Sequence, residues 1–167
     1  AAGSGASACI LCTAGTYAVA GSTSCSPCAP GTYSSISVTC IGDCECNPSS
    51  GSVTSGTISD GPGNYPHYAQ CRWLIASPGP ITLTFSSLYT EPGNGNVYVY
   101  SCNSSSCGQK EELAVKDGYY SGVSLGTYTS YTGYLEVVFT SNSNTTYSGF
   151  SAIWSTALSG CKTCPAG

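Results

Sequence analysis

Five short stretches of the chain alternate apolar with polar side chains, at residues 71–75, 81–85, 97–100, 135–139 and 150–154. A period of two places one face of a β-strand in a core and the other face in solvent. Clusters of Gly, Pro, Asn and Ser separate these stretches. Short alternating strands with frequent turns predict an antiparallel β-sandwich over residues 46–157. No convincing helical period occurs there, although residues 110–115 could form one helical turn.

The first 45 residues carry many cysteines and few large apolar side chains, so cross-links must hold them together. Residues 9–17 return as residues 25–33, a period of 16 residues in which Cys, Gly, Thr and Tyr coincide. A third, shorter copy of the cysteine pattern follows at Cys40 and Cys44. Residues 158–167 restart the pattern with Cys161 and Cys164. We therefore expect a disulfide-rich, loop-dominated repeat segment over residues 1–45 and the start of a further repeat at 158–167.

The chain has 12 Cys in 167 residues, a density that persists only in an oxidising compartment. We therefore expect an extracellular protein, secreted or on the cell surface. Zinc is the alternative use of so many thiols, but it usually needs His ligands as well, and His67 is the sole histidine. Redox chemistry is a further alternative for the repeated CxxC, but the βαβ context of such motifs is missing.

Charged residues make up 7% of the chain and the net charge is −4. Four scattered cations exclude a nucleic-acid footprint and a polybasic membrane patch. No apolar run approaches the roughly 18 residues of a membrane span, so we expect no membrane insertion in this segment. Two sequons predict N-linked glycans on Asn103 and Asn144, whereas Asn47 precedes Pro48 and should stay unmodified.

Cys46 is followed by Gly-Pro-Gly-Asn-Tyr-Pro at 61–66 and by Cys-Arg-Trp-Leu-Ile at 71–75, before the later alternating stretches. This order of motifs, from Cys46 up to residue 156, resembles a CUB domain. The resemblance implies a two-sheet, jelly-roll-like sandwich with a Cys46–Cys71 disulfide. It also implies a second bridge, which here would join Cys102 to Cys107 in an unusually tight loop.

The resemblance raises the question of calcium, because many CUB domains bind it through one Glu and two Asp. Glu91 matches the family's Glu, but Gly95 or Asn96 and then Asn142 stand where the family has Asp. One carboxylate is a poor site for a hard cation. We therefore expect no cofactor, and the alternative is calcium bound at Glu91 in a degenerate form of the family's site.

The N-terminal unit is similar to the Cys-rich, EGF-like modules of ephrin receptors and tumour-necrosis-factor receptors. In such a repeat, the second Cys of each CxxC is expected to bridge forward to the next repeat. The pairs are then Cys12–Cys25 and Cys28–Cys40, with Cys44–Cys161 pairing the two cysteines that flank the sandwich. Connectivity does not follow from sequence alone.

Cys9 and Cys164 have no partner under this forward-bridging rule. Joining the tail of one copy to the head of another leaves 11 residues between Cys164 and Cys9, against 12 between Cys12 and Cys25 and 11 between Cys28 and Cys40. We therefore expect a Cys9–Cys164 bond between neighbouring units, in one tandem polypeptide or between head-to-tail copies. A heterologous contact that does not close builds a fibre.

No constellation for catalysis is recognisable. The single histidine follows a proline in a turn-rich stretch, and nucleophilic catalysis needs a base beside its nucleophile. Glu111 and Glu112 are adjacent, so on a strand they would point to opposite faces, while Asp43 and Glu45 lie among cysteines. We therefore expect no enzyme activity.

Thirteen Tyr remain to be explained, several of them at Tyr98, Tyr100 and between 119 and 134. They fit either cross-strand pairs on a sandwich surface or a contact surface.

These observations favour a structural or adhesive extracellular module, a repeating unit of a disulfide-linked glycoprotein filament or stalk, whose partners are further copies of itself. The alternatives are the ligand-binding ectodomain of a receptor or secreted recognition protein, and the non-catalytic part of a secreted protease.

Overall fold

The computed structural model describes residues 16–17, 26–27, 32–33, 36–44, 50–51, 54–120, 125–156 and 162–163. All regular secondary structure in these ranges is β-strand, which confirms the all-β fold class that the sequence predicts. The same ranges contain no helix that is long and apolar enough to cross a bilayer.

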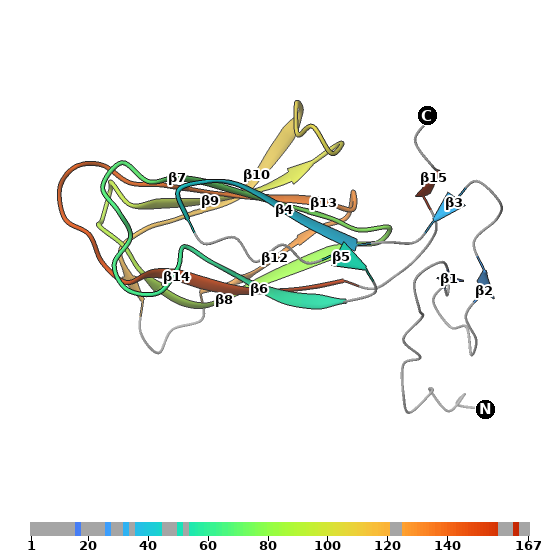
Figure 1. Cartoon of the computed structure of the whole chain (residues 1–167), viewed down its shortest axis with the longest axis horizontal. Helices are drawn as coiled ribbons and strands as arrows, with labels where there is room; N and C mark the ends of the chain where they lie inside the picture. Colours follow the sequence, from blue (N-terminus) through green and yellow to red (C-terminus); the bar gives the residue numbers. More distant parts are fainter. Residues whose placement is uncertain are drawn as a thin grey trace, which may run out of the picture.

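Most strands belong to two antiparallel sheets that face each other (Figure 1). The larger sheet has the order β10-β9-β13-β7-β4-β5, formed by β4 (Ile36–Gly42), β5 (Ser50–Gly51), β7 (Gln70–Ala76), β9 (Asn96–Cys102), β10 (Lys110–Lys116) and β13 (Tyr134–Thr140). The second sheet has the order β11-β8-β14-β6, with β12 also paired to β8. Its strands are β6 (Ser55–Ser59), β8 (Ile81–Tyr89), β11 (Tyr119–Tyr120), β12 (Thr127–Ser130) and β14 (Gly149–Thr156).

Two short ladders lie outside the sandwich. β1 (Thr16–Tyr17) pairs with β2 (Ser26–Pro27), and β3 (Thr32–Tyr33) pairs with β15 (Lys162–Thr163). The second ladder pairs Tyr33 with Lys162 and Thr32 with Thr163, which brings the segment before the sandwich beside the segment after it.

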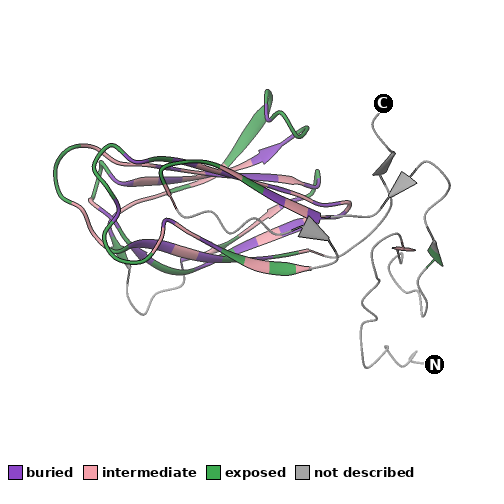
Figure 2. Ribbon diagram, in the orientation of Figure 1, coloured by how far each residue is buried: buried purple, intermediate pink, exposed green. Residues whose placement is uncertain are grey.

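The alternating pattern becomes the inner faces of the sandwich, and all five expected strands are present. β7 and the first half of β8 alternate buried and more accessible positions along their length (Figure 2). Aromatic side chains fill the centre of the core. Phe150 has ring contacts with Trp73 at 5.4 Å, Phe139 at 5.9 Å and Phe85 at 6.0 Å. The contacts with Trp73 and Phe85 are edge-to-face, and contacts of this kind stabilise the core beyond the burial of apolar area.

Two expectations about local structure are wrong. Residues 36–42 form β4, which pairs with β7 over six residues, so the sandwich starts before the boundary expected at residue 46. Ile36 and Val38 alternate with polar residues and enter the core, a pattern too short to separate from the cysteine repeat by sequence. Residues 110–115 form no helical turn but belong to edge strand β10, which pairs with β9.

Two expected disulfides are also wrong, because Cys71 is bonded to Cys44 and not to Cys46. β4 runs beside β7 with Gly42 opposite Cys71, and this register brings Cys44 to a Cα–Cα distance of 5.6 Å from Cys71. The same bond excludes Cys44–Cys161. The structure does join Cys102 to Cys107, as expected. Cys40 is disulfide-bonded. The pairings Cys12–Cys25, Cys28–Cys40 and Cys9–Cys164 each include cysteines outside the described residues.

Candidate functional site

Loops from both sheets meet around Tyr65 at one end of the sandwich. The Tyr65 side chain is buried, with its ring edge-on to Phe139 at 5.0 Å. Its backbone N–H donates to the Tyr147 carbonyl at 3.0 Å, and its hydroxyl donates to the Thr145 carbonyl at 3.3 Å. The same hydroxyl accepts from the backbone N–H of Glu91 at 3.0 Å. Burial raises the pKa of Tyr65 above its ordinary value. Tyr65 therefore connects its own loop with the turn that contains Glu91 and with the loop between β13 and β14.

Glu91 opens the turn between β8 and β9 at this end. Its carbonyl accepts from the N–H groups of Asn94 at 3.1 Å and Gly95 at 2.8 Å. A Cβ on Gly95 would lie 2.9 Å from the Glu91 nitrogen and 3.0 Å from the Tyr65 hydroxyl, so only glycine fits there. Among the described residues, Glu91 Oε2 is buried and has no hydrogen-bond partner. A buried unpaired carboxylate oxygen is costly, so it marks a place where a cation or a donor would be favourable.

The other positions of the degenerate calcium site do not complete a ligand set. Asn96 begins β9, and Asn142 lies in the loop between β13 and β14. Asn142 Oδ1 accepts from the Asn144 N–H at 2.8 Å, so the loop itself uses that amide oxygen. Glu91 therefore supplies one carboxylate where calcium prefers several charged oxygens.

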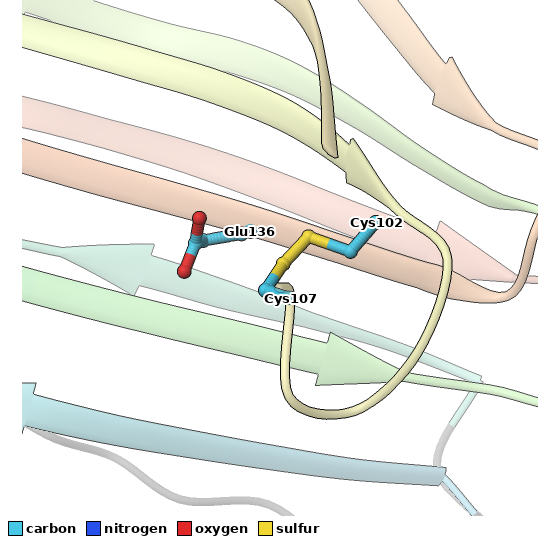
Figure 3. Close-up of side chains that lie close together, drawn as sticks. All are labelled: Cys102, Cys107 and Glu136. Atoms are coloured by element: carbon cyan, nitrogen blue, oxygen red, sulfur yellow. A yellow bond between two sulfur atoms is a disulfide. The ribbon is translucent and has the colours of Figure 1, made fainter. Parts of the chain in front are cut away.

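One cluster in the described part of the chain has the composition of a metal site, namely Cys102, Cys107 and Glu136, whose ligand atoms lie within 4.8 Å of one another. The two cysteines form a disulfide beside the Glu136 carboxylate (Figure 3), so their sulfur atoms are not available as thiolate ligands. Glu136 is instead buried between two cations. Arg72 Nε donates to one oxygen, and Lys110 Nζ donates to the other at 2.7 Å.

Aromatic rings complete the surroundings of this ion pair. Lys110 Nζ lies 3.9 Å from the centre of the Tyr100 ring, and the Tyr100 ring stacks on Tyr98 at 6.1 Å. Burial, and after it the charge of Glu112, raises the pKa of Tyr100. Sequence reasoning missed the importance of Glu136, because an alternating strand marks it only as a residue of the solvent face.

Sequence reasoning also missed Asp60, which stands at the start of one of the turn-like clusters between the alternating stretches. Asp60 is 6% exposed and accepts from the Phe150 N–H at 2.6 Å, while its Oδ2 has no partner among the described residues. Burial raises the pKa of its carboxyl from 3.8 to about 6, against the opposing effect of the Phe150 hydrogen bond. An open pocket of about 190 Å³ lies beside it, lined by residues 60–66.

The side chains considered for catalysis are dispersed over the surface. His67 is exposed in the loop before β7, and Glu111 and Glu112 are exposed on edge strand β10. Asp43 is exposed after β4, whereas Glu45 lies outside the described residues. The structure brings none of the described ones into one site.

The tyrosines between 119 and 134 separate in space. Tyr128 contacts Phe85 and Tyr119 contacts Tyr89, whereas Tyr131 is 82% exposed. The glycosylation candidates Asn103 and Asn144 are both exposed in loops, which is the accessibility that glycan attachment requires.

The two facing sheets and the core between them form an antiparallel β-sandwich whose fold is similar to that of CUB domains. It is similar to the CUB1-EGF-CUB2 domains of rat MASP-1, with a TM-score of 0.53, 19% sequence identity, and coverage of 63% of this chain and 41% of that one. It is also similar to the CUB1-EGF-CUB2 domain of human MASP-1/3, with a TM-score of 0.54, 18% identity, and coverage of 69% and 52%. The chain thus spans about half the length of these neighbours.

No protein-family model matches the chain, and no curated protein matches it in sequence. The likeness to solved structures therefore concerns the fold. The two disulfides joining described residues agree with an extracellular, oxidising environment.

Proposed function

We propose that the chain is a non-enzymatic structural or adhesive module, in which a CUB-like sandwich is inserted into a series of Cys-rich repeats. Copies of the module join end to end as units of a disulfide-linked glycoprotein filament or stalk.

The register of the two short ladders carries this proposal. In the first, Thr16 and Tyr17 pair with Pro27 and Ser26, the two residues between the cysteines of the next CxxC. In the second, the equivalent Thr-Tyr of the following repeat, at 32–33, pairs with Thr163 and Lys162 in that order. These are again the two residues between cysteines, those of the CxxC at 161–164. The tail thus pairs as the next repeat in line.

A consequence for the disulfides follows from this equivalence. If Cys12 bonds Cys25 across the first ladder, then the matching bond across the second ladder is Cys28–Cys161. This bond would replace the expected Cys28–Cys40 pairing, because Cys40 lies in β4 opposite Trp73, within the larger sheet of the sandwich. Cys40 is itself disulfide-bonded, to a cysteine outside the described residues. Cys164 then stands where Cys12 and Cys28 stand, and it bridges forward to Cys9 of the next unit.

Peptide mapping of the assembled protein under non-reducing conditions tests the proposal. The expected bonds are Cys28–Cys161 within a unit and Cys164–Cys9 between units, and electron microscopy of the same specimen should show filaments. The variants Cys9→Ser and Cys164→Ser should shorten or abolish filaments without unfolding the sandwich, whose described disulfides do not use them. Free Cys9 and Cys164 thiols in an assembled specimen would contradict the proposal.

A ligand-binding ectodomain is the second candidate function, and the unpaired buried Glu91 Oε2 favours it. A cation held at Glu91 would stabilise the loops around Tyr65, because a ligand that binds the folded state raises its stability. Calcium should then raise the unfolding temperature of the unmodified protein and leave that of the Glu91→Gln variant unchanged. Glu112→Gln, on the exposed edge strand, is the matched control. Equal responses of both variants to calcium would exclude this site.

A further inference from the structure

Three tyrosine rings are in contact at the loop end of the sandwich. Tyr89 ends β8, Tyr119 begins β11 directly opposite it, and Tyr147 lies in the loop between β13 and β14. The ring centre of Tyr89 is 4.7 Å from that of Tyr119 and 4.4 Å from that of Tyr147. Tyr89 is 39% exposed and Tyr119 is 64% exposed, so solvent reaches the cluster.

The composition of the chain directs oxidation towards these phenols. Methionine and free cysteine are the side chains that oxidants usually modify first. The chain has no Met, and every cysteine in its described part is disulfide-bonded. Trp73 and Trp154 are 2% and 0% exposed, so an oxidant in solution does not reach them. Exposed tyrosines are then the accessible oxidisable groups of the described surface.

We propose that Tyr89 forms a dityrosine cross-link with one of the two rings packed on it, when hydrogen peroxide and a haem peroxidase oxidise the protein. Each phenol loses one electron and one proton and becomes a tyrosyl radical. The two radicals form a carbon–carbon bond between ring positions ortho to the oxygens. The ring hydrogen at each coupled carbon then moves to the oxygen and restores the phenol. Overall, the two rings lose one hydrogen atom each, and one peroxide is reduced to two waters.

The contact geometry makes this coupling intramolecular. Two radicals held in ring contact meet without diffusion, which gives them a very high effective concentration relative to radicals on separate molecules. The product joins β8 either to β11 or to the loop whose Tyr147 carbonyl accepts a hydrogen bond from the Tyr65 N–H. It therefore fastens the loop end of the sandwich, whether or not copies assemble into a filament.

The experiment treats the dilute, folded, full chain with a haem peroxidase and limiting hydrogen peroxide. The expected product is a monomer lighter by two hydrogen atoms with dityrosine fluorescence. After reduction of the disulfides, trypsin should yield peptide 73–110, which contains Tyr89, covalently joined to peptide 117–162, which contains both neighbours.

Tyrosine-to-phenylalanine variants locate the bond and keep the packing of the rings. Tyr89→Phe and the double variant Tyr119→Phe/Tyr147→Phe should each lose the monomeric product. Tyr131→Phe is the matched control, because that residue is 82% exposed and has no ring contact within the described structure. It should leave the yield unchanged. A monomeric cross-link that survives Tyr89→Phe, or oxidation that yields only cross-linked dimers, would overturn the proposal.

Discussion

At the scale of single residues, two buried carboxylates are held in different ways. Glu136 is paired with Arg72 and Lys110, whereas Asp60 has one hydrogen bond from Phe150 and an oxygen without a partner among the described residues. Burial with little compensation raises the pKa of the Asp60 carboxyl, whereas the two cations beside Glu136 offset the burial of its charge. The two sites therefore respond differently to substitution.

The stability of the protein should depend on pH through Asp60. Its pKa is about 6 in the folded protein against a reference value of 3.8, so folding is favoured when the group is protonated. This contribution is complete below pH 4 and is lost as the pH rises through 6, at a cost of up to about 3 kcal/mol. Urea unfolding of Asp60→Asn between pH 3.5 and 7.5 should lack this decline. Asp43→Asn, an exposed carboxylate, should retain it, and an unchanged slope in Asp60→Asn would contradict the assignment.

At the Glu136 ion pair, removal of a cation should cost more unfolding free energy than removal of the carboxylate. Arg72→Met leaves a buried carboxylate with one cation and should lower the free energy of unfolding by about 3 kcal/mol. Glu136→Gln leaves two cations whose side chains are 36% and 37% exposed, and water can solvate them. Its cost should therefore be smaller, about 1 kcal/mol. Urea unfolding measures both, and a larger loss for Glu136→Gln would show that the carboxylate is not the group that needs compensation.

At the scale of elements, the two edges of the larger sheet are protected in different ways. Edge strand β10 carries Lys110, Glu111, Glu112 and Lys116 and has an irregular register between Glu112 and Ala114. Charges and bulges on an edge strand oppose pairing with another chain. Near the other edge, Cys44–Cys71 joins the end of β4 to β7. The other disulfide, Cys102–Cys107, lies at the end of β9, next to edge strand β10. The two disulfides thus stabilise opposite sides of the sheet.

The contributions of these disulfides should follow the lengths of the loops that they close. Cys44–Cys71 spans 27 residues and Cys102–Cys107 spans 5. In the chain-entropy account, they stabilise the folded state by about 3.5 and about 2 kcal/mol respectively. Urea unfolding of the double variants Cys44→Ser/Cys71→Ser and Cys102→Ser/Cys107→Ser measures this order. The reverse order would mean that packing around Cys102 matters more than loop closure.

At the scale of the whole molecule, charge is distributed unevenly. The strands of the second sheet, β6, β8, β11, β12 and β14, contain no charged residue. Their solvent side is instead rich in hydroxyls, with Thr82 and Thr129 at 3.2 Å and Thr84 and Thr127 at 3.1 Å across β8 and β12. A surface with so few charges has little electrostatic protection against association. Hydrophilic groups other than charges must keep the molecule in solution.

Glycans should supply this protection. We expect N-linked sugar on the exposed residues Asn103 and Asn144, so that Asn103→Gln and Asn144→Gln each lower the intact mass by one glycan. Asn47→Gln, at a position followed by proline, is the matched control and should lower it by none. Enzymatic removal of the glycans should lower the solubility of the folded protein. An intact mass equal to that of the polypeptide would refute this expectation.

The sequence by itself determined the features that depend on neighbours along the chain. Alternation of side chains identified strands such as β7 and β13, because the two faces of a strand differ in environment within a few residues. The order of those strands and their turns was sufficient for an antiparallel sandwich, and the resemblance of its motifs supplied the CUB-like form. Glu91 could be placed in a loop in the same way, but its buried, unpaired oxygen could not be foreseen.

Only the tertiary structure decided which distant residues meet. Cys44 and Cys46 are nearly equivalent in sequence, and the register of β4 beside β7 selected Cys44 for Cys71. The contacts of Glu136 with Arg72 and Lys110, and of Tyr89 with Tyr147, likewise join residues on separate strands and loops. Such contacts follow from the pairing of strands across a sheet. That pairing is set by packing of the whole core, which no local pattern of polar and apolar residues contains.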